Sequence, residues 1–368
     1  MKRSIAISLG LTAAALSAAG AEAWKLSRSL SGLHRVDGQG ALYYAEYRGN
    51  YYDPVLRLPV KLLGSGGCSS FFCRSEQGEL LNCRNYDLPH RDSEGNVTGL
   101  NVILRCRPKK GYASLGVADA AWLGMLKLPY TMGKLEEAPA IPTALLPWLT
   151  MDGINEMGLC LSIHALDVKD GESAVKQKVR GRERLSVNEL LRIGLDSCAD
   201  VEEFLELADS VNLHHLLKND FHIFATDASG AAAVLEWRCN ELYVTRQDAV
   251  TNFYVCAEDA EDCYMKGQLK ERFTEPPRCE REYHYGYGHG YGRFFTLAET
   301  LCAHGSREDA LAVLSEREAA ALLREVSQEF DGGDLTSCTQ YSAVYHHDRL
   351  SLDVFSMRDY ENMYSFSL

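Results

Sequence analysis

The stretch Gly67-Cys68-Ser69-Ser70-Phe71-Phe72, followed after a polar turn by Asn82-Cys83-Arg84-Asn85-Tyr86-Asp87, decides how this chain is interpreted. Both pieces have the composition of β-strands, and a Gly-containing turn between them predicts a hairpin. Such a hairpin brings Arg84 and Asp87 back beside Cys68. A thiol next to an arginine is the usual setting of a nucleophilic cysteine with a lowered pKa. The alternative is an ordinary hairpin with a buried cysteine and a surface Arg–Asp pair.

Further strands and helices follow this hairpin along the chain. Alternating apolar residues predict three more hairpins, over 148–164, 221–237 and 341–355. The capping box formed by Ser186 and Glu189 opens a predicted helix that ends near Cys198, and other helices are predicted over 201–209, 293–303, 306–315 and 316–330. Strands lead, helices follow and strands close the chain, which indicates a layered α+β fold rather than a βαβ repeat.

Residues 1–23 have the features of a targeting segment. The basic pair Lys2-Arg3 precedes an apolar run from Ile5 to Gly20, and Ala21-Glu22-Ala23 fits the site of a signal peptidase. The alternative is an uncleaved membrane anchor through residues 5–23, because the apolar run approaches the ~18–20 residues that span a bilayer. Both predict an exported protein, extracellular or in the cell envelope, either secreted or anchored at its N-terminus.

Residues 24–67 separate this segment from the hairpin. They begin with a polar, irregular stretch over 24–40 and close with Gly64-Ser65-Gly66-Gly67. The glycines leave almost no side chain over the next peptide bond and favour a flexible backbone. We therefore expect a pro-segment over 24–67 that is removed, and a functional domain over 68–368.

Composition narrows the classes of partner. The chain is 46% hydrophobic and 24% charged, as in globular proteins with a substantial core. A net charge of −13 argues against nucleic acid as a partner, because phosphate contacts require clustered Lys and Arg. Twelve cysteines occur without any C-x-x-C pair, so a structural zinc site is not indicated. We expect no metal or organic cofactor.

A cut before Cys68 would change the chemistry of this residue. Its free α-amine would have a pKa of about 7.7–8.0 and could act as general base for its own thiol. One residue would then supply both the nucleophile and the base. Arg84 would favour the thiolate by its charge, and Asp87 would orient the amine.

Several short motifs occur in an order that resembles the choloylglycine hydrolase family, a family of N-terminal-nucleophile (Ntn) hydrolases that includes bile salt hydrolases and penicillin V acylases. The resemblance extends over about 68–356. Its motifs are Cys68, Arg84-Asn85-Tyr86-Asp87, Asp152-Gly153-Ile154-Asn155-Glu156-Met157-Gly158-Leu159, Thr251-Asn252, Gly292-Arg293-Phe294 and Thr339-Gln340-Tyr341-Ser342. The resemblance implies a four-layer αββα sandwich with two stacked, mainly antiparallel sheets.

The same resemblance implies roles for individual residues. Cys68 is the implied nucleophile, with Arg84 and Asp87 as the pair that positions it, and Arg293 as a second arginine nearby. Asn252 is an implied oxyanion-hole donor, although composition alone reads it as a turn residue and Arg293 as a solvated helix residue. The second donor is the backbone N–H of Ala165 (or His164).

Positions 155 and 165 are interpreted separately from the catalytic residues. Asn155 is interpreted as a turn former outside the catalytic set. At position 165 bile salt hydrolases carry asparagine and penicillin V acylases tyrosine, so Ala165 leaves the substrate subgroup open.

The implied function is an Ntn cysteine amidase that hydrolyses a linear amide through an acyl-thioester on Cys68. The substrate would be an N-acyl amine or N-acyl amino acid, with conjugated bile salts among the candidates. Alternatives are a penicillin V acylase-like or acid ceramidase-like acylase, or a non-catalytic envelope protein that keeps the fold. Candidates for the lining of an apolar acyl pocket are Leu145, Leu146, Trp148 and the loop over 283–292, which is rich in Tyr and Gly. Homotetramers are common among relatives of this kind, so the resemblance is compatible with a homo-oligomer. The apolar run is compatible with a membrane tether through residues 5–23.

Overall fold

The computed structural model describes much of the chain between residues 29 and 368. The described residues are 29–38, 41–52, 67–88, 90–91, 97–122, 135, 144–166, 175–214, 220–238, 240–255, 290–307, 310–329 and 338–368. The predicted targeting segment 1–23 lies outside them. Among the helices in these ranges, none has the length and apolar character needed to cross a membrane.

One sheet contains nine strands, and all neighbours run antiparallel except β2 and β7. Its strands, in spatial order, are β1 (Leu30–Arg35), β2 (Leu42–Gly49), β7 (Asn101–Pro108), β8 (Ser114–Asp119), β9 (Thr150–Asn155), β10 (Cys160–Leu166), β13 (Asp220–Thr226), β14 (Ala232–Arg238) and β15 (Glu241–Thr245).

The second sheet contains six strands, and all its neighbours are antiparallel. They are, in spatial order, β16 (Ala249–Val250), β3 (Gly67–Arg74), β4 (Leu80–Asp87), β17 (Tyr341–His346), β18 (Ser351–Ser356) and β19 (Met363–Ser367). The predicted first hairpin is β3–β4, and its register sets Cys68 opposite Tyr86. Two small two-stranded sheets pair β5 (His90–Arg91) with β6 (Val97–Thr98) and β11 (Arg184–Leu185) with β12 (Asn212–Leu213).

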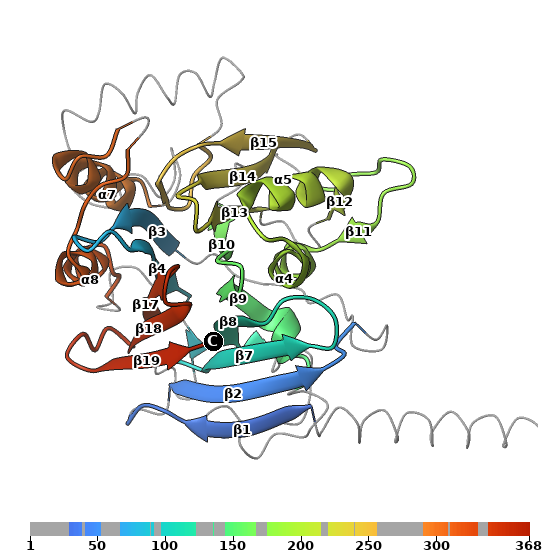
Figure 1. Cartoon of the computed structure of the whole chain (residues 1–368), viewed down its shortest axis with the longest axis horizontal. Coiled ribbons are helices and arrows are strands. Elements are labelled where there is room, and N and C mark those ends of the chain that lie inside the picture. Colours follow the sequence, from blue (N-terminus) through green and yellow to red (C-terminus); the bar gives the residue numbers. More distant parts are fainter. Residues whose placement is uncertain are drawn as a thin grey trace, which may run out of the picture.

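Helices cover the outer faces of both sheets (Figure 1). On the nine-stranded sheet, α4 (Val187–Ser197) lies against β9 and β10, and α5 (Val201–Ser210) lies against β14. On the six-stranded sheet, α7 (Tyr291–Ala303) contacts β3 and α8 (Glu316–Glu325) contacts β4. The sheets meet where β3 contacts β10. The predicted α+β fold with two stacked sheets between helical layers is confirmed.

Local sequence signals explain where several elements begin and end. Ser186 accepts from the amide of Glu189, whose carboxylate accepts from the amide of Ser186, so the predicted capping box starts α4. Asn155 accepts from two amides of its own turn and donates to two carbonyls at the end of α4. The interpretation of Asn155 as a turn former agrees with these contacts.

Two segments differ from the sequence-based expectation. Residues 30–35, expected to be irregular, form the edge strand β1. The described part of 306–315 is not helical, because its backbone bonds to β3 instead: Arg74 donates to the carbonyl of Ala312 and accepts from the amide of Leu314. Trp148, a candidate for the acyl pocket, is 2% exposed and packs edge-on against Tyr51, and its place in such a pocket stays a prediction. Residues 283–289 of the candidate loop lie outside the described residues.

Candidate active site

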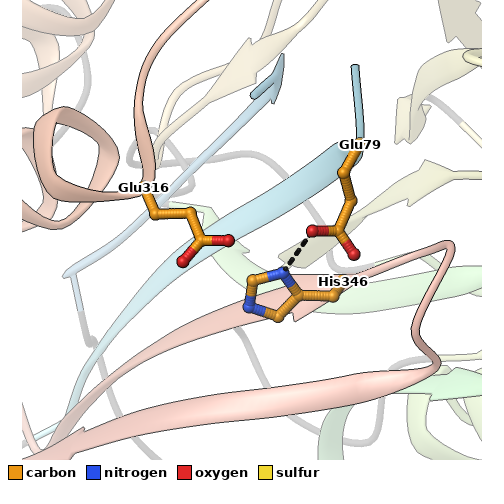
Figure 2. Close-up of side chains that lie close together, drawn as sticks. All are labelled: Glu79, Glu316 and His346. Atoms are coloured by element: carbon orange, nitrogen blue, oxygen red, sulfur yellow. Dashed lines mark hydrogen bonds and ion pairs between the residues drawn. The ribbon is translucent and has the colours of Figure 1, made fainter. Parts of the chain in front are cut away.

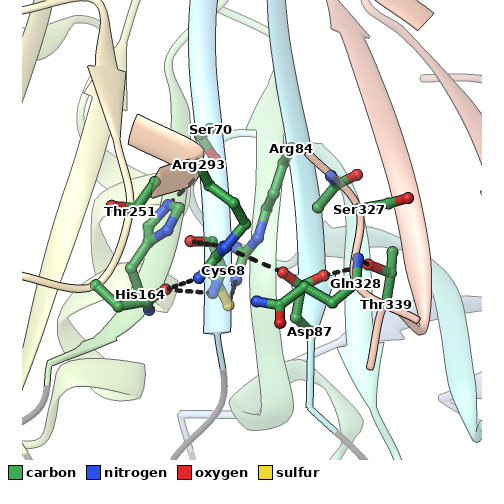
Figure 3. A network of polar contacts seen from close by, with 12 residues as sticks. Cys68, Ser70, Arg84, Asp87, His164, Thr251, Arg293, Ser327, Gln328 and Thr339 are labelled. Carbon is green, nitrogen blue, oxygen red and sulfur yellow. Dashed lines mark hydrogen bonds and ion pairs between the residues drawn. The ribbon is translucent and has the colours of Figure 1, made fainter. Parts of the chain in front are cut away.

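Cys68 lies at the start of β3, between the two sheets. Its side chain and that of Ser70 alternate with Phe71, which packs toward α7 and α8 on the outer face. Ser70 reaches His164 of β10, with 3.2 Å between the hydroxyl oxygen and Nε2. Cys68 is 3% exposed in the intact chain. The strand thus holds the thiol in the layer between the sheets, with the predicted partners Arg84, Asp87 and Arg293 nearby (Figure 3).

Arg84 is the charged neighbour of the thiol. One of its terminal nitrogens lies 3.7 Å from Cys68 Sγ and donates to the carbonyl of Ile163 at 2.5 Å. The other lies 2.8 Å from Asp152 and donates to the carbonyl of Met151 at 2.7 Å. The guanidinium is completely buried. Residues of β9 and β10 therefore orient a side chain that belongs to the opposite sheet.

Asn252 and Arg293 bind the backbone of Cys68. The amide nitrogen of Cys68 donates to Asn252 Oδ1 at 2.7 Å, and Arg293 donates to the carbonyl of Cys68 at 2.9 Å. Arg293 also donates to Asn252 Oδ1 at 2.9 Å. The side-chain amide of Asn252 donates to the carbonyl of Ala165 at 2.7 Å. Residues far apart in the sequence thus meet at the nitrogen that a cut before Cys68 would free.

Asp87 completes this group. Its carboxylate lies 3.3 Å from Arg293 and accepts a hydrogen bond from the Thr339 hydroxyl at 2.6 Å. Thr339 in turn accepts from the backbone amide of Gln328 at 2.7 Å. Asp87 is therefore held on one side by a cation and on the other by a hydroxyl from the segment that precedes β17.

Arg293 reaches the site because α7 begins with glycine. Gly290, the N-cap, has a φ of +87°, a conformation that favours glycine. A Cβ there would lie 2.7 Å from the guanidinium of Arg293 and 2.9 Å from Thr251. A cation in the first turn of a helix is disfavoured by the helix dipole. Asp87 and the carbonyl of Cys68 offset this cost.

Position 165 lies next to the predicted oxyanion donor. Ala165 is on β10, and its carbonyl is the acceptor for Asn252. His164 is fully buried, and its Nε2 lies within hydrogen-bond distance of Ser70 and Ser162. Burial among cationic neighbours holds the pKa of His164 well below its ordinary value, so its ring is neutral. Of the two residues, Ala165 is the one whose backbone contacts Asn252.

The pKa of the Cys68 thiol differs from the sequence-based expectation. Burial raises the pKa of Cys68 more than the neighbouring Arg84 lowers it. The lowered pKa expected from an adjacent arginine is therefore wrong for the intact chain. Burial also raises the pKa of Asp87 to about 6, although Arg293 and Thr339 act in the opposite direction. The intact site thus holds a neutral thiol that needs a base before it can react as a thiolate.

Sequence reasoning missed the partners of Arg84. Asp152 begins the motif over 152–159, and it pairs with Arg84 and accepts from the hydroxyls of Tyr341 (at 2.5 Å) and Tyr345. All three are buried, and they join β9 of one sheet to β17 of the other. An acidic residue inside an apolar hairpin was the only available signal, because its arginine is distant in the sequence.

A cluster of potential metal ligands lies elsewhere, where the turn before β4, the start of α8 and the end of β17 meet. Figure 2 shows Glu79, Glu316 and His346, whose ligand atoms lie within 4.8 Å of one another. Arg349 donates to both carboxylates, at 2.9 and 2.6 Å, and contacts the ring of His346. This arginine already supplies the positive charge that a metal ion would bring, and the donor set is explained as an ion-pair network.

Solved structures of other proteins share this fold. The structure is similar to that of conjugated bile acid hydrolase from Clostridium perfringens (TM-score 0.52, 16% identity, 82% of this chain and 92% of that chain). It is also similar to penicillin V acylase from Agrobacterium tumefaciens (TM-score 0.51, 16% identity, 82% of this chain and 86% of that chain). At these identities the likeness shows a shared fold. No curated protein matches the sequence.

The sequence itself also matches a family. The model for linear amide C-N hydrolases, choloylglycine hydrolase family, matches residues 68–253, just over half of the 368 residues. The match begins at Cys68 and includes Arg84, Asp87 and Asn252. Members of this family hydrolyse C–N bonds in linear amides. The chain therefore belongs to the choloylglycine hydrolase family of linear amide C-N hydrolases.

Proposed function

We propose that this protein hydrolyses a linear N-acyl amide through an acyl-thioester on Cys68, after its own cleavage before that residue. The observation that carries the proposal is the environment of the Cys68 amide nitrogen. This atom donates to Asn252 Oδ1, and Arg293 donates to the same oxygen and to the carbonyl of Cys68. The nitrogen that the proposed cut would free is thus held by a buried side chain that also contacts a buried arginine.

Activation requires the peptide bond between Gly67 and Cys68 to break. In the proposed step the Cys68 thiol attacks the carbonyl carbon of Gly67 and its proton passes to the peptide nitrogen. The C–N bond then breaks to give a thioester and a free α-amine. Water hydrolyses the thioester, which releases a carboxylate at Gly67 and restores the thiol.

In the proposed hydrolysis the new amine takes the proton of the thiol, whose pKa burial alone leaves too high for a thiolate. The sulfur attacks the substrate carbonyl, and the side-chain amide of Asn252 with the backbone N–H at Ala165 (or His164) stabilises the oxyanion. The amide C–N bond breaks when the leaving nitrogen is protonated. Water then hydrolyses the acyl-thioester and releases the acid.

We leave the acyl group at the level of its chemical class. Conjugated bile salts, phenoxyacetyl amides and fatty N-acyl amines of the ceramide type are all N-acyl amides. Position 165 is asparagine in bile salt hydrolases and tyrosine in penicillin V acylases, so Ala165 favours neither conjugated bile salts nor phenoxyacetyl amides. The non-catalytic alternative lacks a specific observation in its favour, whereas the contacts of the Cys68 nitrogen favour catalysis. We also propose an exported enzyme, on the basis of residues 1–23.

The test combines intact mass with a substrate panel. We expect the purified wild-type protein to be cut before Cys68 and to release amine from at least one of the three acyl classes. Cys68→Ala should remain uncut and inactive. The matched control is Cys302→Ala, which removes an exposed thiol on α7 and should change neither result. Turnover that survives in Cys68→Ala would refute the proposal.

A further inference from the structure

The segment before Cys68 is part of the folded domain. Strands β1 and β2, drawn in blue in Figure 1, form one edge of the nine-stranded sheet. Strand β2 pairs in parallel with β7 over eight residues, Leu42 to Gly49 against Asn101 to Pro108. The ladder continues on both sides, where Ala41 and Gly49 accept from the amides of Asn101 and Lys109. A segment that was only a leader would not need this pairing.

Side chains of the same segment contribute to the core between layers. Four of them are completely buried and belong to the largest hydrophobic cluster: Leu42, Tyr43, Ala45 and Tyr47. Tyr51, just after β2, is also fully buried and packs edge-on against Tyr47 and Trp148. Loss of the segment would expose the apolar surface that these side chains cover.

Polar contacts fasten the segment to helices and strands that follow Cys68. Tyr51 and Tyr52 both donate through their hydroxyls to Asp196 of α4 at 2.6 Å. The indole of Trp148 donates to the carbonyl of Tyr51 at 3.1 Å. In the six-stranded sheet, the hydroxyl of Ser356 donates to Asp37 at 2.5 Å. The segment is thus bound by residues of both sheets and of one helix.

Removal would also create a new sheet edge. Strand β7 is almost wholly buried over Asn101–Leu104, and its outer neighbour is β2. Without β2 this strand would present a row of unpaired amides and carbonyls, with apolar side chains beside them, which is a template for aggregation. The polar edge strand β1 instead presents the exposed residues Ser31 and Gly32 to solvent.

From these contacts we infer that cleavage before Cys68 does not release the preceding segment: the piece that ends at Gly67 stays bound as a second, non-covalent subunit through β1, β2 and Tyr51. This inference rests on the cut that forms part of the proposed function. Cleavage then frees the α-amine of Cys68 while the sheet keeps all nine strands. The pro-segment is in this view a structural subunit of the mature enzyme.

The first experiment uses the wild-type chain. Native size-exclusion chromatography is followed by intact-mass analysis of the denatured peak. We expect two polypeptides in equal amounts, one that ends at Gly67 and one that begins at Cys68. A folded and active protein that consists of residues 68–368 alone would overturn the inference.

A second experiment separates this inference from self-cleavage. A site for a specific protease is inserted between Leu63 and Gly64 in Cys68→Ala, and the purified protein is cut with that protease. We expect both pieces to elute together under native conditions. Separation of the pieces with the larger one still folded would overturn the inference. An uncut wild-type chain would contradict the proposed activation only, because this variant tests retention independently.

A matched pair of variants tests the contacts themselves. Tyr51→Phe removes a hydroxyl that donates across the interface to Asp196, whereas Tyr44→Phe removes one that donates to Glu46 within the same piece. In mild urea the cut Tyr51→Phe protein should lose its N-terminal piece about tenfold faster, as expected for a hydrogen bond to a carboxylate. Tyr44→Phe should match the parent. Equal rates for the two variants would contradict the assigned interface.

Discussion

Arg84 and Asp152 form a completely buried ion pair in the site. Asp152→Asn keeps the shape of the side chain and removes its charge. Both partners are completely buried, 2.8 Å apart, so the guanidinium would be left without a counter-charge. Breaking a buried pair in this way costs about 3–5 kcal/mol. We expect the free energy of unfolding to fall by that amount, which corresponds to a decrease in Tm of the order of 10 °C.

The control is an ion pair on the surface. Glu46→Gln removes a carboxylate 3.0 Å from Arg48, whose side chain is 62% exposed. Solvent screening limits such a pair to about 0–1 kcal/mol. Both variants are measured in the Cys68→Ala background by denaturant unfolding, so that neither is affected by cleavage. If Asp152→Asn destabilises the protein by no more than Glu46→Gln, then the reasoning that Asp152 neutralises Arg84 is wrong.

Three other changes test the site and its support. Asn252→Ala removes the proposed oxyanion donor, so release of amine by fully cut protein should fall about 10²–10³-fold; an unchanged rate would exclude that role. Self-cleavage of the intact chain should slow as the pH falls through about 6, because Asp87 is ionised above that value and its protonation weakens the pairing with Arg293. A time course of intact mass on either side of this pH checks it, and Asp87→Asn should show no such dependence. Ser186→Ala removes the N-cap of α4 and should lower the free energy of unfolding by about 1 kcal/mol, with turnover unchanged.

The parts of the fold that sequence could predict are those specified by nearby residues. The hairpin of β3 and β4, the turn at Asn155 and the cap at Ser186 each depend on side chains within a few positions of one another. Strand β1 could not be predicted, because most of its side chains are exposed and no apolar alternation marks it. Its structure comes from pairing with β2, which is a tertiary effect.

The residues of the site also differ in how far apart they lie in the sequence. Cys68, Arg84 and Asp87 lie on one hairpin, so spacing alone was enough to bring them together. Asn252 and Arg293 entered only through a resemblance, since their contacts with Cys68 cross about 184 and 225 positions. No local pattern in the sequence records that Asp152 faces Arg84 from the other sheet.

The raised pKa of Cys68 and the proposed retention of the preceding segment have a common physical origin. Charge suggested a thiolate beside Arg84, and composition suggested a pro-segment that is removed; neither expectation took burial into account. In the intact chain burial outweighs the arginine and raises the pKa of the thiol. The same packing buries β2 and holds the segment in the sheet. A cut before Cys68 would then add a base exactly where the thiol lacks one, without opening the core that surrounds it. Activation on this basis requires the loss of one peptide bond, and not the loss of a domain.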